Sequence, residues 1–311
     1  MRVQKDTRRS PGRACPTPTA GREASLFLVF AAACLALAAP TAMAVPAQAS
    51  AAEGAYVALG DSYTAVGTLT ERVPGTPSAC NQDTDNYPHV VARSLGLQLA
   101  DVSCSGAEVG DLAAAQSADS PPQFDALTPS TAVVTLGIGG NDNNTFSTAV
   151  RGCEAIDALH VFDIGSPCAD YYKSTFTDAI AADEVNIAGA VQRIHRLAPQ
   201  AKVFVVGYPD ILPRSGNCRP RLTLTTKDTA YLDNVERALN SMLRRVAEGN
   251  GATYVDTYTP SIGHDACQSA ATRWVEPLVP AGSFAPFHPN AVGQQRTAAA
   301  VEAALRDAGI G

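Results

Sequence analysis

The stretch Tyr56-Val57-Ala58-Leu59-Gly60-Asp61-Ser62-Tyr63 decides the fold. Its apolar first half is typical of a buried strand, and Gly-Asp-Ser is a turn signal that ends the strand abruptly. Ser62 is therefore expected at the carboxyl edge of a sheet, where open α/β folds place their ligand crevices. A serine there can act as a nucleophile if a base and an oxyanion site converge on it, whereas an isolated Asp-Ser turn would only start a loop or a helix.

Strands and helices alternate along the rest of the chain. Further strands are expected at residues 97–102, 132–138, 202–206 and 252–255, and helices at 87–95, 108–116, 178–197, 226–248 and 291–307. Residues 143–175 show no clean period, and we interpret them as an excursion pinned by a disulfide. The alternation predicts an α/β fold, with a parallel, doubly wound sheet in a three-layer sandwich.

The first 49 residues are expected to form a signal peptide. Basic residues up to Arg22 precede an apolar run from Leu26 to Ala39, and small-residue cleavage sites end at Ala44 and Ala49. The apolar run is too short to span a membrane. Residues 50–311 are therefore predicted to be a single domain of a secreted, extracellular protein that has no stable membrane anchor.

The expected mature protein is acidic. Cleavage after residue 49 removes six of the 23 Lys and Arg residues and two of the 30 Asp and Glu residues, which leaves 17 and 28 and a net charge of −11. An acidic surface without basic clusters argues against nucleic acids and anionic membranes as partners.

Six cysteines remain once Cys15 and Cys34 are removed with the signal. An even number in an exported protein indicates three disulfides, for which fifteen pairings are possible from sequence alone. Pairing of neighbours would close loops that contribute roughly 3 to 4 kcal/mol each. The alternative of a metal site at His264-x-x-Cys267 has no Cys-x-x-Cys to support it. The six cysteines are Cys80, Cys104, Cys153, Cys168, Cys218 and Cys267.

His288 is the predicted general base. It lies just before the last expected helix, and Pro289 fixes the turn, which makes a rigid place for a base. His160 is a competitor because Asp157 lies three residues upstream, but it falls inside the excursion and not at a strand end. The other histidines are in expected helices or beside a cysteine: His89, His195 and His264.

Three groups could stabilise a developing oxyanion. They are the backbone N–H of Ser62, the backbone N–H of Gly106 in a turn after the second strand, and the side-chain amide of Asn141 in the turn Gly139-Gly140-Asn141-Asp142. Removal of one such donor typically costs about 3 to 4 kcal/mol of transition-state stabilisation. Each residue alone could equally be an ordinary turn residue.

Together these blocks resemble the SGNH (GDSL) hydrolase family, in their order and approximate spacing, over nearly the whole mature chain. The blocks are Gly60-Asp61-Ser62, Gly106, Gly139-Gly140-Asn141-Asp142 and His288-Pro289. The resemblance implies a flavodoxin-like sheet, Ser62 as the nucleophile, His288 as the base, and Ser62, Gly106 and Asn141 as oxyanion donors. The six cysteines are similar to those of the secreted actinobacterial lipase, phospholipase A1 and esterase branch, which implies disulfides between consecutive cysteines.

One position departs from the family pattern. The family usually has Asp-x-x-His at the last block, whereas this chain has Ala285-Pro286-Phe287-His288. Secreted members that are similar use a backbone carbonyl, so we expect the carbonyl of Ala285 or of a neighbour to accept the Nδ1–H bond of His288. A more distant carboxylate, Asp256 or Asp265, is the alternative. A neutral acceptor gives a bond weaker by about 1 kcal/mol, and a dyad remains adequate.

The sequence thus predicts a secreted, lipase- or phospholipase-like carboxylic-ester hydrolase with a Ser62/His288 dyad. Its substrate would be an acyl ester, and acyl transfer through serine needs no metal or cofactor. The absence of Gly-x-Ser-x-Gly excludes the nucleophile elbow of the other common serine esterases. The alternatives are an acyl esterase of polysaccharide or plant polymer and a non-catalytic binding protein on the same scaffold. We expect a monomer.

Overall fold

The structure of the chain, a computed structural model, describes residues 55–160, 162–279 and 282–311. The predicted signal peptide lies outside the described residues. A five-stranded parallel sheet has the strand order β2-β1-β3-β4-β5, which is the flavodoxin-like order that the resemblance implied. The strands are β1 (Ala55–Gly60), β2 (Gln98–Asp101), β3 (Val133–Gly137), β4 (Lys202–Val206) and β5 (Thr253–Val255).

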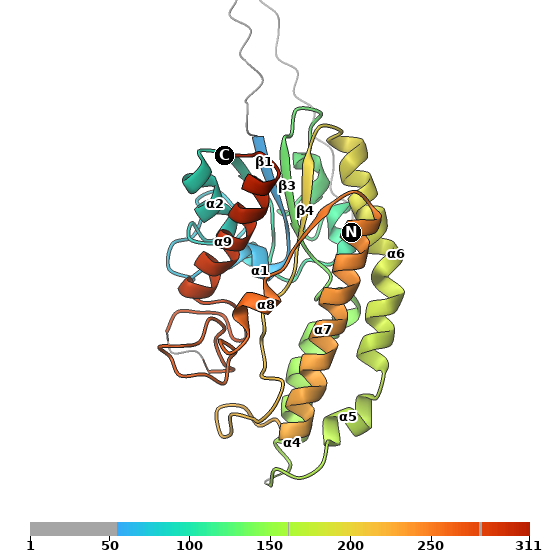
Figure 1. The fold of residues 1–311 in the computed structure, drawn as a ribbon, viewed down its shortest axis with the longest axis vertical. Coiled ribbons are helices and arrows are strands. Elements are labelled where there is room, and N and C mark those ends of the chain that lie inside the picture. Colours follow the sequence, from blue (N-terminus) through green and yellow to red (C-terminus); the bar gives the residue numbers. More distant parts are fainter. Residues whose placement is uncertain (1–54, 161, 280–281) are drawn as a thin grey trace, which may run out of the picture. The chain divides into compact units, whose positions relative to one another are not determined.

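Helices cover both faces of this sheet, as Figure 1 shows. The long helices are α2 (Tyr87–Leu95) and α9 (Ala291–Asp307) on one face, and α6 (Thr175–Leu197) and α7 (Thr226–Gly249) on the other. A hydrophobic core lies on each face of the sheet, and successive residues of β1 point into the two cores alternately. Tyr56 and Ala58 pack with α2 and α9, and Val57 and Leu59 pack with the core that α6 and α7 line. Both faces of the strand are buried, which explains its continuous apolar sequence.

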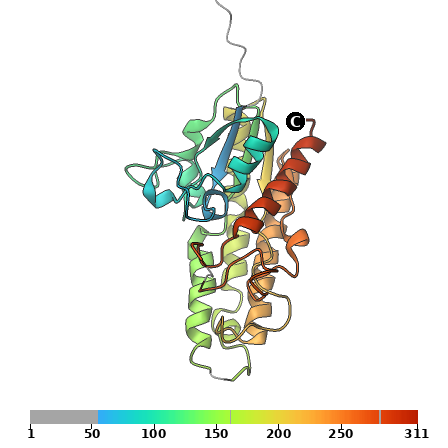
Figure 2. The same cartoon turned by 90° about the vertical axis from the view of Figure 1, so that its left-hand side faces the viewer.

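Helices α6 and α7 extend beyond the carboxyl ends of the strands (Figures 1 and 2). The segment between β3 and α6 runs along this extension, and the Cys153–Cys168 disulfide pins it, as we expected of this excursion. Its short helices were not expected. Its helices are too short to give a period: α3 (Thr145–Ser147), the π-helical turn η5 (Thr148–Gly152), α4 (Cys153–Asp157) and α5 (Pro167–Tyr172).

The prediction of a helix at 108–116 is wrong, since only a 3₁₀ turn forms there. The remaining short elements are α1 (Ser62–Ala65), α8 (Tyr258–Ser261) and the 3₁₀ turns η1 (Ser78–Cys80), η2 (Val109–Leu112), η3 (Gln123–Ala126) and η4 (Asp142–Asn144). The other expected elements are confirmed to within three residues at each end. For α2, the Asn86 side chain accepts a bond from His89 N–H at the start, and Gly96 ends the helix with a φ of 66°.

The three disulfides join consecutive cysteines, as the resemblance implied. They are Cys80–Cys104, Cys153–Cys168 and Cys218–Cys267. Among the described residues, no helix is both long and apolar enough to cross a bilayer.

Candidate active site

Ser62 lies at the carboxyl end of β1, as its sequence context predicts. β1 ends at Gly60, whose φ is 154°, and a Cβ there would come within 2.5 Å of the Gly137 carbonyl oxygen. Only glycine therefore lets β1 and β3 approach at this turn. The Asp61 side chain then accepts a hydrogen bond from Tyr63 N–H (2.8 Å) and caps α1, whose first residue is Ser62.

His288 and Ser62 are in hydrogen-bond contact, 226 positions apart in sequence. The distance from His288 Nε2 to Ser62 Oγ is 2.8 Å, and the distance from His288 Nδ1 to the Pro286 carbonyl oxygen is 2.7 Å. A carbonyl only accepts, so Nδ1 carries the proton and Nε2 is left to accept from the serine hydroxyl. Burial lowers the pKa of His288, and the Pro286 bond opposes that shift only in part. The ring is thus neutral at pH 7.

The acceptor for Nδ1 is Pro286, the neighbour of the residue that we named first. The Ala285 carbonyl instead accepts the backbone N–H of His288 at 3.2 Å. Neither distant carboxylate contacts the ring: Asp256 bonds Arg244 and Thr259, and Asp265 bonds the 267–268 turn. Ser62 and His288 are therefore paired without a carboxylate to orient the imidazole.

Two aromatic rings hold the imidazole, and the sequence analysis identified neither. Tyr63 stacks on His288 with ring centroids 4.8 Å apart, and its hydroxyl donates to the Phe287 carbonyl at 2.5 Å. Phe146 packs on the imidazole in a T-shaped arrangement, with ring centroids 5.9 Å apart. The position of Tyr63, directly after the predicted nucleophile, was the one signal that could have pointed to it.

A second buried network lies behind the serine. The Tyr208 hydroxyl donates to Asp61 Oδ2 (2.5 Å) and accepts from the Gly140 N–H (2.9 Å). It therefore ties together the ends of β1, β3 and β4. Burial raises the pKa of Asp61 to about 7, although the Tyr208 bond lowers it. The turn containing Tyr208 was expected at a strand end, but not its contact with Asp61.

The two other predicted oxyanion donors lie on loops that are bonded to each other. Asn141 Nδ2 donates to the Ala107 carbonyl (3.1 Å), and Val109 N–H donates to Asp142 Oδ1 (3.0 Å). These bonds join the loop that carries Gly106, whose φ is 76°, to the turn after β3. One of the two Asn141 amide hydrogens is used in this way, which fixes the direction of the other.

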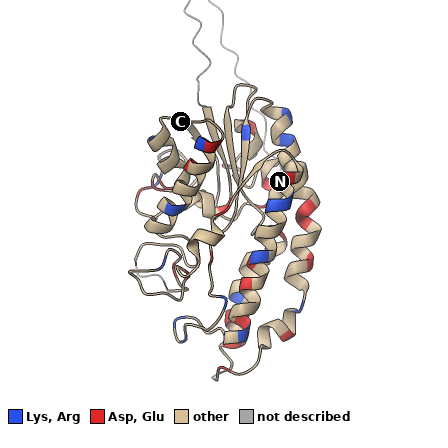
Figure 3. Cartoon of the chain, viewed as in Figure 1, with Lys and Arg blue, Asp and Glu red and all other residues tan. Residues whose placement is uncertain are grey.

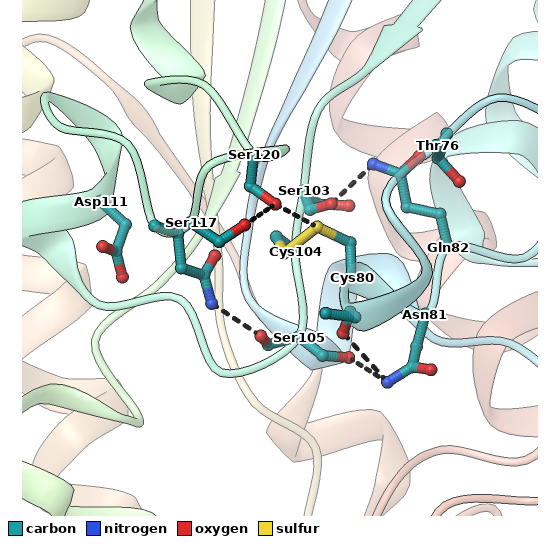
Figure 4. Close-up of a disulfide and its surroundings, with 12 residues drawn as sticks. Thr76, Cys80, Asn81, Gln82, Ser103, Cys104, Ser105, Asp111, Ser117 and Ser120 are labelled. Carbon is teal, nitrogen blue, oxygen red and sulfur yellow. Dashed lines mark hydrogen bonds between the residues drawn. A yellow bond between two sulfur atoms is a disulfide. The ribbon is translucent and has the colours of Figure 1, made fainter. Parts of the chain in front are cut away.

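The loop that carries Gly106 is also fixed from its other side. Cys104 is bonded to Cys80, Ser105 N–H donates to the Cys80 carbonyl (3.0 Å), and Cys104 N–H donates to the Gly60 carbonyl (2.9 Å). Figure 4 shows this disulfide with Ser103, Ser105 and Ser120 around it. The polypeptide that bears Gly106 is thus attached to the Gly60 turn immediately before the predicted nucleophile.

The comparison with known families agrees with this geometry. A model described as the GDSL-like Lipase/Acylhydrolase family matches residues 58–296, which is more than half of the chain. The chain belongs to this family. Lipase 2 of Streptomyces coelicolor is 43% identical to this GDSL-like hydrolase over 261 residues, which cover 83% of this chain and 88% of that protein.

Two solved structures share the fold. Phospholipase A1 from Streptomyces albidoflavus NA297 has a TM-score of 0.65 at 25% identity, covering 82% of this chain and 98% of its own. An extracellular lipase from Streptomyces rimosus has a TM-score of 0.63 at 25% identity, covering 82% and 99%. The predicted family is confirmed, and the GDSL-like hydrolase is an enzyme that cleaves carboxylic esters rather than a non-catalytic binding protein.

The competing histidines of the GDSL-like hydrolase lie elsewhere. The His160 ring contacts the Ile156 carbonyl (3.0 Å), while the Asp157 carboxylate faces Thr225 N–H (2.8 Å). His264 stacks on Trp274, with centroids 4.0 Å apart, and Cys267 is in a disulfide. The two helical histidines bond Asn86 and Asn250: they are His89 and His195.

An apolar cavity of about 60 Å³ is lined in part by Phe146, whose ring contacts that of His288. Its near end is formed by Gly140, Phe146 and Tyr208, which contact the dyad or its supporting network. It continues between α6, α7 and the segment after β3, where it is lined by Val150, Ile180, Leu232, Val235 and Leu239. Glu236 lies in the wall, where it accepts a hydrogen bond from the Ile211 N–H (3.1 Å), and burial raises the pKa of its carboxyl. The rest of the lining is mainly aliphatic.

Proposed function

We propose that this GDSL-like hydrolase is a secreted lipase that cleaves esters of apolar fatty acids through a Ser62/His288 dyad. The observation that carries the proposal is the 2.8 Å contact between His288 Nε2 and Ser62 Oγ, with Nδ1 held by Pro286. A base in that position can take the serine proton as the bond to the acyl carbon forms.

The first half of the reaction forms an acyl-serine. Ser62 Oγ attacks the acyl carbon while His288 Nε2 takes its proton, and the carbonyl oxygen becomes an oxyanion. The N–H groups of Ser62 and Gly106 and the free amide hydrogen of Asn141 are the proposed donors to that oxyanion. As the intermediate collapses, His288 returns the proton to the leaving alcohol oxygen.

Water completes the cycle by the reverse steps. His288 takes a proton from water, the hydroxide attacks the acyl-serine carbonyl, and the proton returns to Ser62 Oγ as the fatty acid leaves. The lowered pKa of His288 suits this role because the ring must be neutral at the start of each half-reaction.

The lining of the cavity favours a longer, apolar acyl group over an acetyl group as the acyl part of the substrate. An acetyl group would leave the aliphatic lining at Val150, Leu232 and Leu239 uncovered, whereas each methylene of a longer chain buried there contributes about 0.8 kcal/mol. This supports the lipase hypothesis over the alternative, a deacetylase of polysaccharide or plant polymer. The three disulfides support export, and with it the proposed signal peptide at residues 1–49 and a single domain at 50–311.

A panel of p-nitrophenyl esters from acetate to palmitate, with triglyceride, phospholipid and acetylated xylan, tests the proposal. We expect the highest kcat/KM on a medium or long chain, and loss of nearly all turnover in Ser62→Ala and His288→Ala. His160→Ala is the matched control and should keep the wild-type rate. Activity confined to acetate and acetylated xylan would contradict the proposal, and a dead His160→Ala with an active His288→Ala would show that the base is wrong.

A further inference from the structure

The loop between α4 and α5 presents several large apolar side chains to water. Leu159, Phe162 and Ile164 are 82%, 74% and 72% exposed, and the neighbouring Asp163, itself exposed, bonds the start of α7. Asp163 accepts bonds from the Thr226 N–H and hydroxyl (2.7 Å each) and from Asn217 Nδ2 (2.8 Å). The bond from Thr226 N–H lowers the pKa of Asp163 and keeps it ionised at the start of α7. The carboxylate of the loop is thus bound to neighbouring polar groups, whereas its large apolar side chains are mostly surrounded by water.

This concentration of exposed apolar groups is unusual within the described part of the chain. Six large apolar side chains there are at least 72% exposed, and three of the six fall within residues 159–164. Single exposed apolar residues are common on protein surfaces, but a local group marks a contact surface. We call Leu159, Phe162 and Ile164 the apolar tip.

A second apolar segment lies beyond the same edge of the sheet, nearer to the strands than the apolar tip (Figures 1 and 2). In Figures 1 and 2, the loop before His288 and the loop between α4 and α5 both lie beyond the carboxyl edge of the sheet, where Ser62 is found. Val279 in the former loop is 77% exposed and Leu278 is 39% exposed. Residues 277–288 contain no charged side chain, in contrast to α7, along which Figure 3 shows both signs of charge.

The apolar tip is also connected along the chain to the wall of the apolar cavity, which we call the acyl cavity. Phe146 and Val150 line the cavity, and the same run of short helices carries the chain onward through α4 to Leu159. A surface that engages the tip would therefore press on the segment that encloses the acyl chain.

We propose that the apolar tip, assisted by Val279, inserts into the surface of an aggregated lipid that carries no net charge. This inference rests on the proposed lipase function, because a lipase must meet its substrate at such a surface. Protruding Leu, Ile, Phe and Val side chains suit the boundary between head groups and acyl chains. The expected net charge of −11 and the lack of a basic cluster favour a zwitterionic over an anionic surface.

Flotation with phosphatidylcholine vesicles tests the inference, with every variant made in a Ser62→Ala background so that lipid is not consumed. The triple variant Leu159→Ser, Phe162→Ser, Ile164→Ser should reduce vesicle partitioning by about 30-fold, because each side chain partly withdrawn from water contributes about threefold. Val279→Ser should reduce it by about threefold. Val185→Ser is the matched control, since Val185 is 72% exposed on α6 and outside both segments. Phosphatidylglycerol vesicles should bind the unaltered tip less well.

Two outcomes would overturn the inference. One is a triple variant that floats as well as the protein with its tip intact. The other is a protein that does not float and forms a dimer that the triple variant abolishes, which would make a second copy of the chain the partner.

Failure of the proposed function is a separate observation: with Ser62 present, soluble p-nitrophenyl butyrate would not be hydrolysed. The three tip substitutions made in the protein that retains Ser62 should leave hydrolysis of that soluble ester within about twofold of wild type, since exposed substitutions disturb the fold little. Should the triple variant fail to fold, Phe162→Ser alone provides the comparison.

Discussion

Replacing Tyr63 by phenylalanine should weaken the positioning of the proposed base, His288, while leaving the imidazole itself unchanged. Phe287, the residue before His288, has a φ of 59°, a left-handed conformation that costs a non-glycine residue about 1 to 2 kcal/mol. Three bonds hold this turn: Tyr63 hydroxyl to Phe287 carbonyl, Phe287 N–H to Glu276 carbonyl, and Glu276 N–H to His288 carbonyl. Tyr63→Phe removes the first of them and keeps the ring that stacks on the imidazole.

The size of the effect follows from what the variant leaves behind. A buried carbonyl that loses its donor costs about 1 to 3 kcal/mol, and the turn can recover part of this only by moving away from Ser62. If about 1.4 kcal/mol of the restraint on His288 is lost, kcat falls about tenfold. KM should be nearly unchanged, since the hydroxyl bonds Phe287 and not the acyl cavity. Tyr63→Leu also removes the ring stack, worth about 1 kcal/mol, and should be about fivefold slower again.

Steady-state kinetics on a soluble ester, with a thermal melt of each variant, check this reasoning. Tyr171→Phe is the control, because Tyr171 is 72% exposed and lies on α5. A kcat for Tyr63→Phe within twofold of the control, or a loss confined to KM, would refute the positioning role.

Three further predictions concern the oxyanion site, the pH profile and the acyl cavity. Asn141→Ala should lower kcat by about 100- to 1,000-fold on soluble esters, and a loss below tenfold would remove it from the oxyanion site. Because burial lowers the His288 pKa and the ring must be neutral to accept a proton, kcat/KM should fall with decreasing pH around a midpoint below the ordinary 6.5; a midpoint above 6.5 would contradict this. Val235→Phe should fill the cavity and lower kcat/KM for octanoate relative to butyrate by about tenfold, the value of roughly two methylenes, whereas Val185→Phe should leave that ratio unchanged.

The sequence predicted those parts of the fold that depend on local signals. Helix α2 has a capping residue, an apolar stripe and a terminal glycine, and both of its ends were predicted correctly. The segment between β3 and α6 was missed because its helices have three to six residues each, too few for a period to emerge. Their helical state depends on packing beside α6 and α7, which no local pattern reports.

The candidate site divides in the same way. Ser62, Gly106, Asn141 and His288 stand in recognisable turns, and the structure brings Ser62 and His288 into contact. The contacts that hold these residues in place have no such local signal in the sequence. Tyr208 reaches Asp61 from 147 positions away, and only the adjacency of β1, β3 and β4 reveals the pair.

The pairing of the cysteines has a consequence for how the chain is made. The three covalent loops span 24, 15 and 49 positions and do not overlap along the polypeptide. A chain delivered amino end first into an oxidising compartment therefore presents each thiol to its proper mate before the next pair emerges. Correct oxidation then needs little reshuffling of disulfides, which favours a high yield of active enzyme during the proposed export.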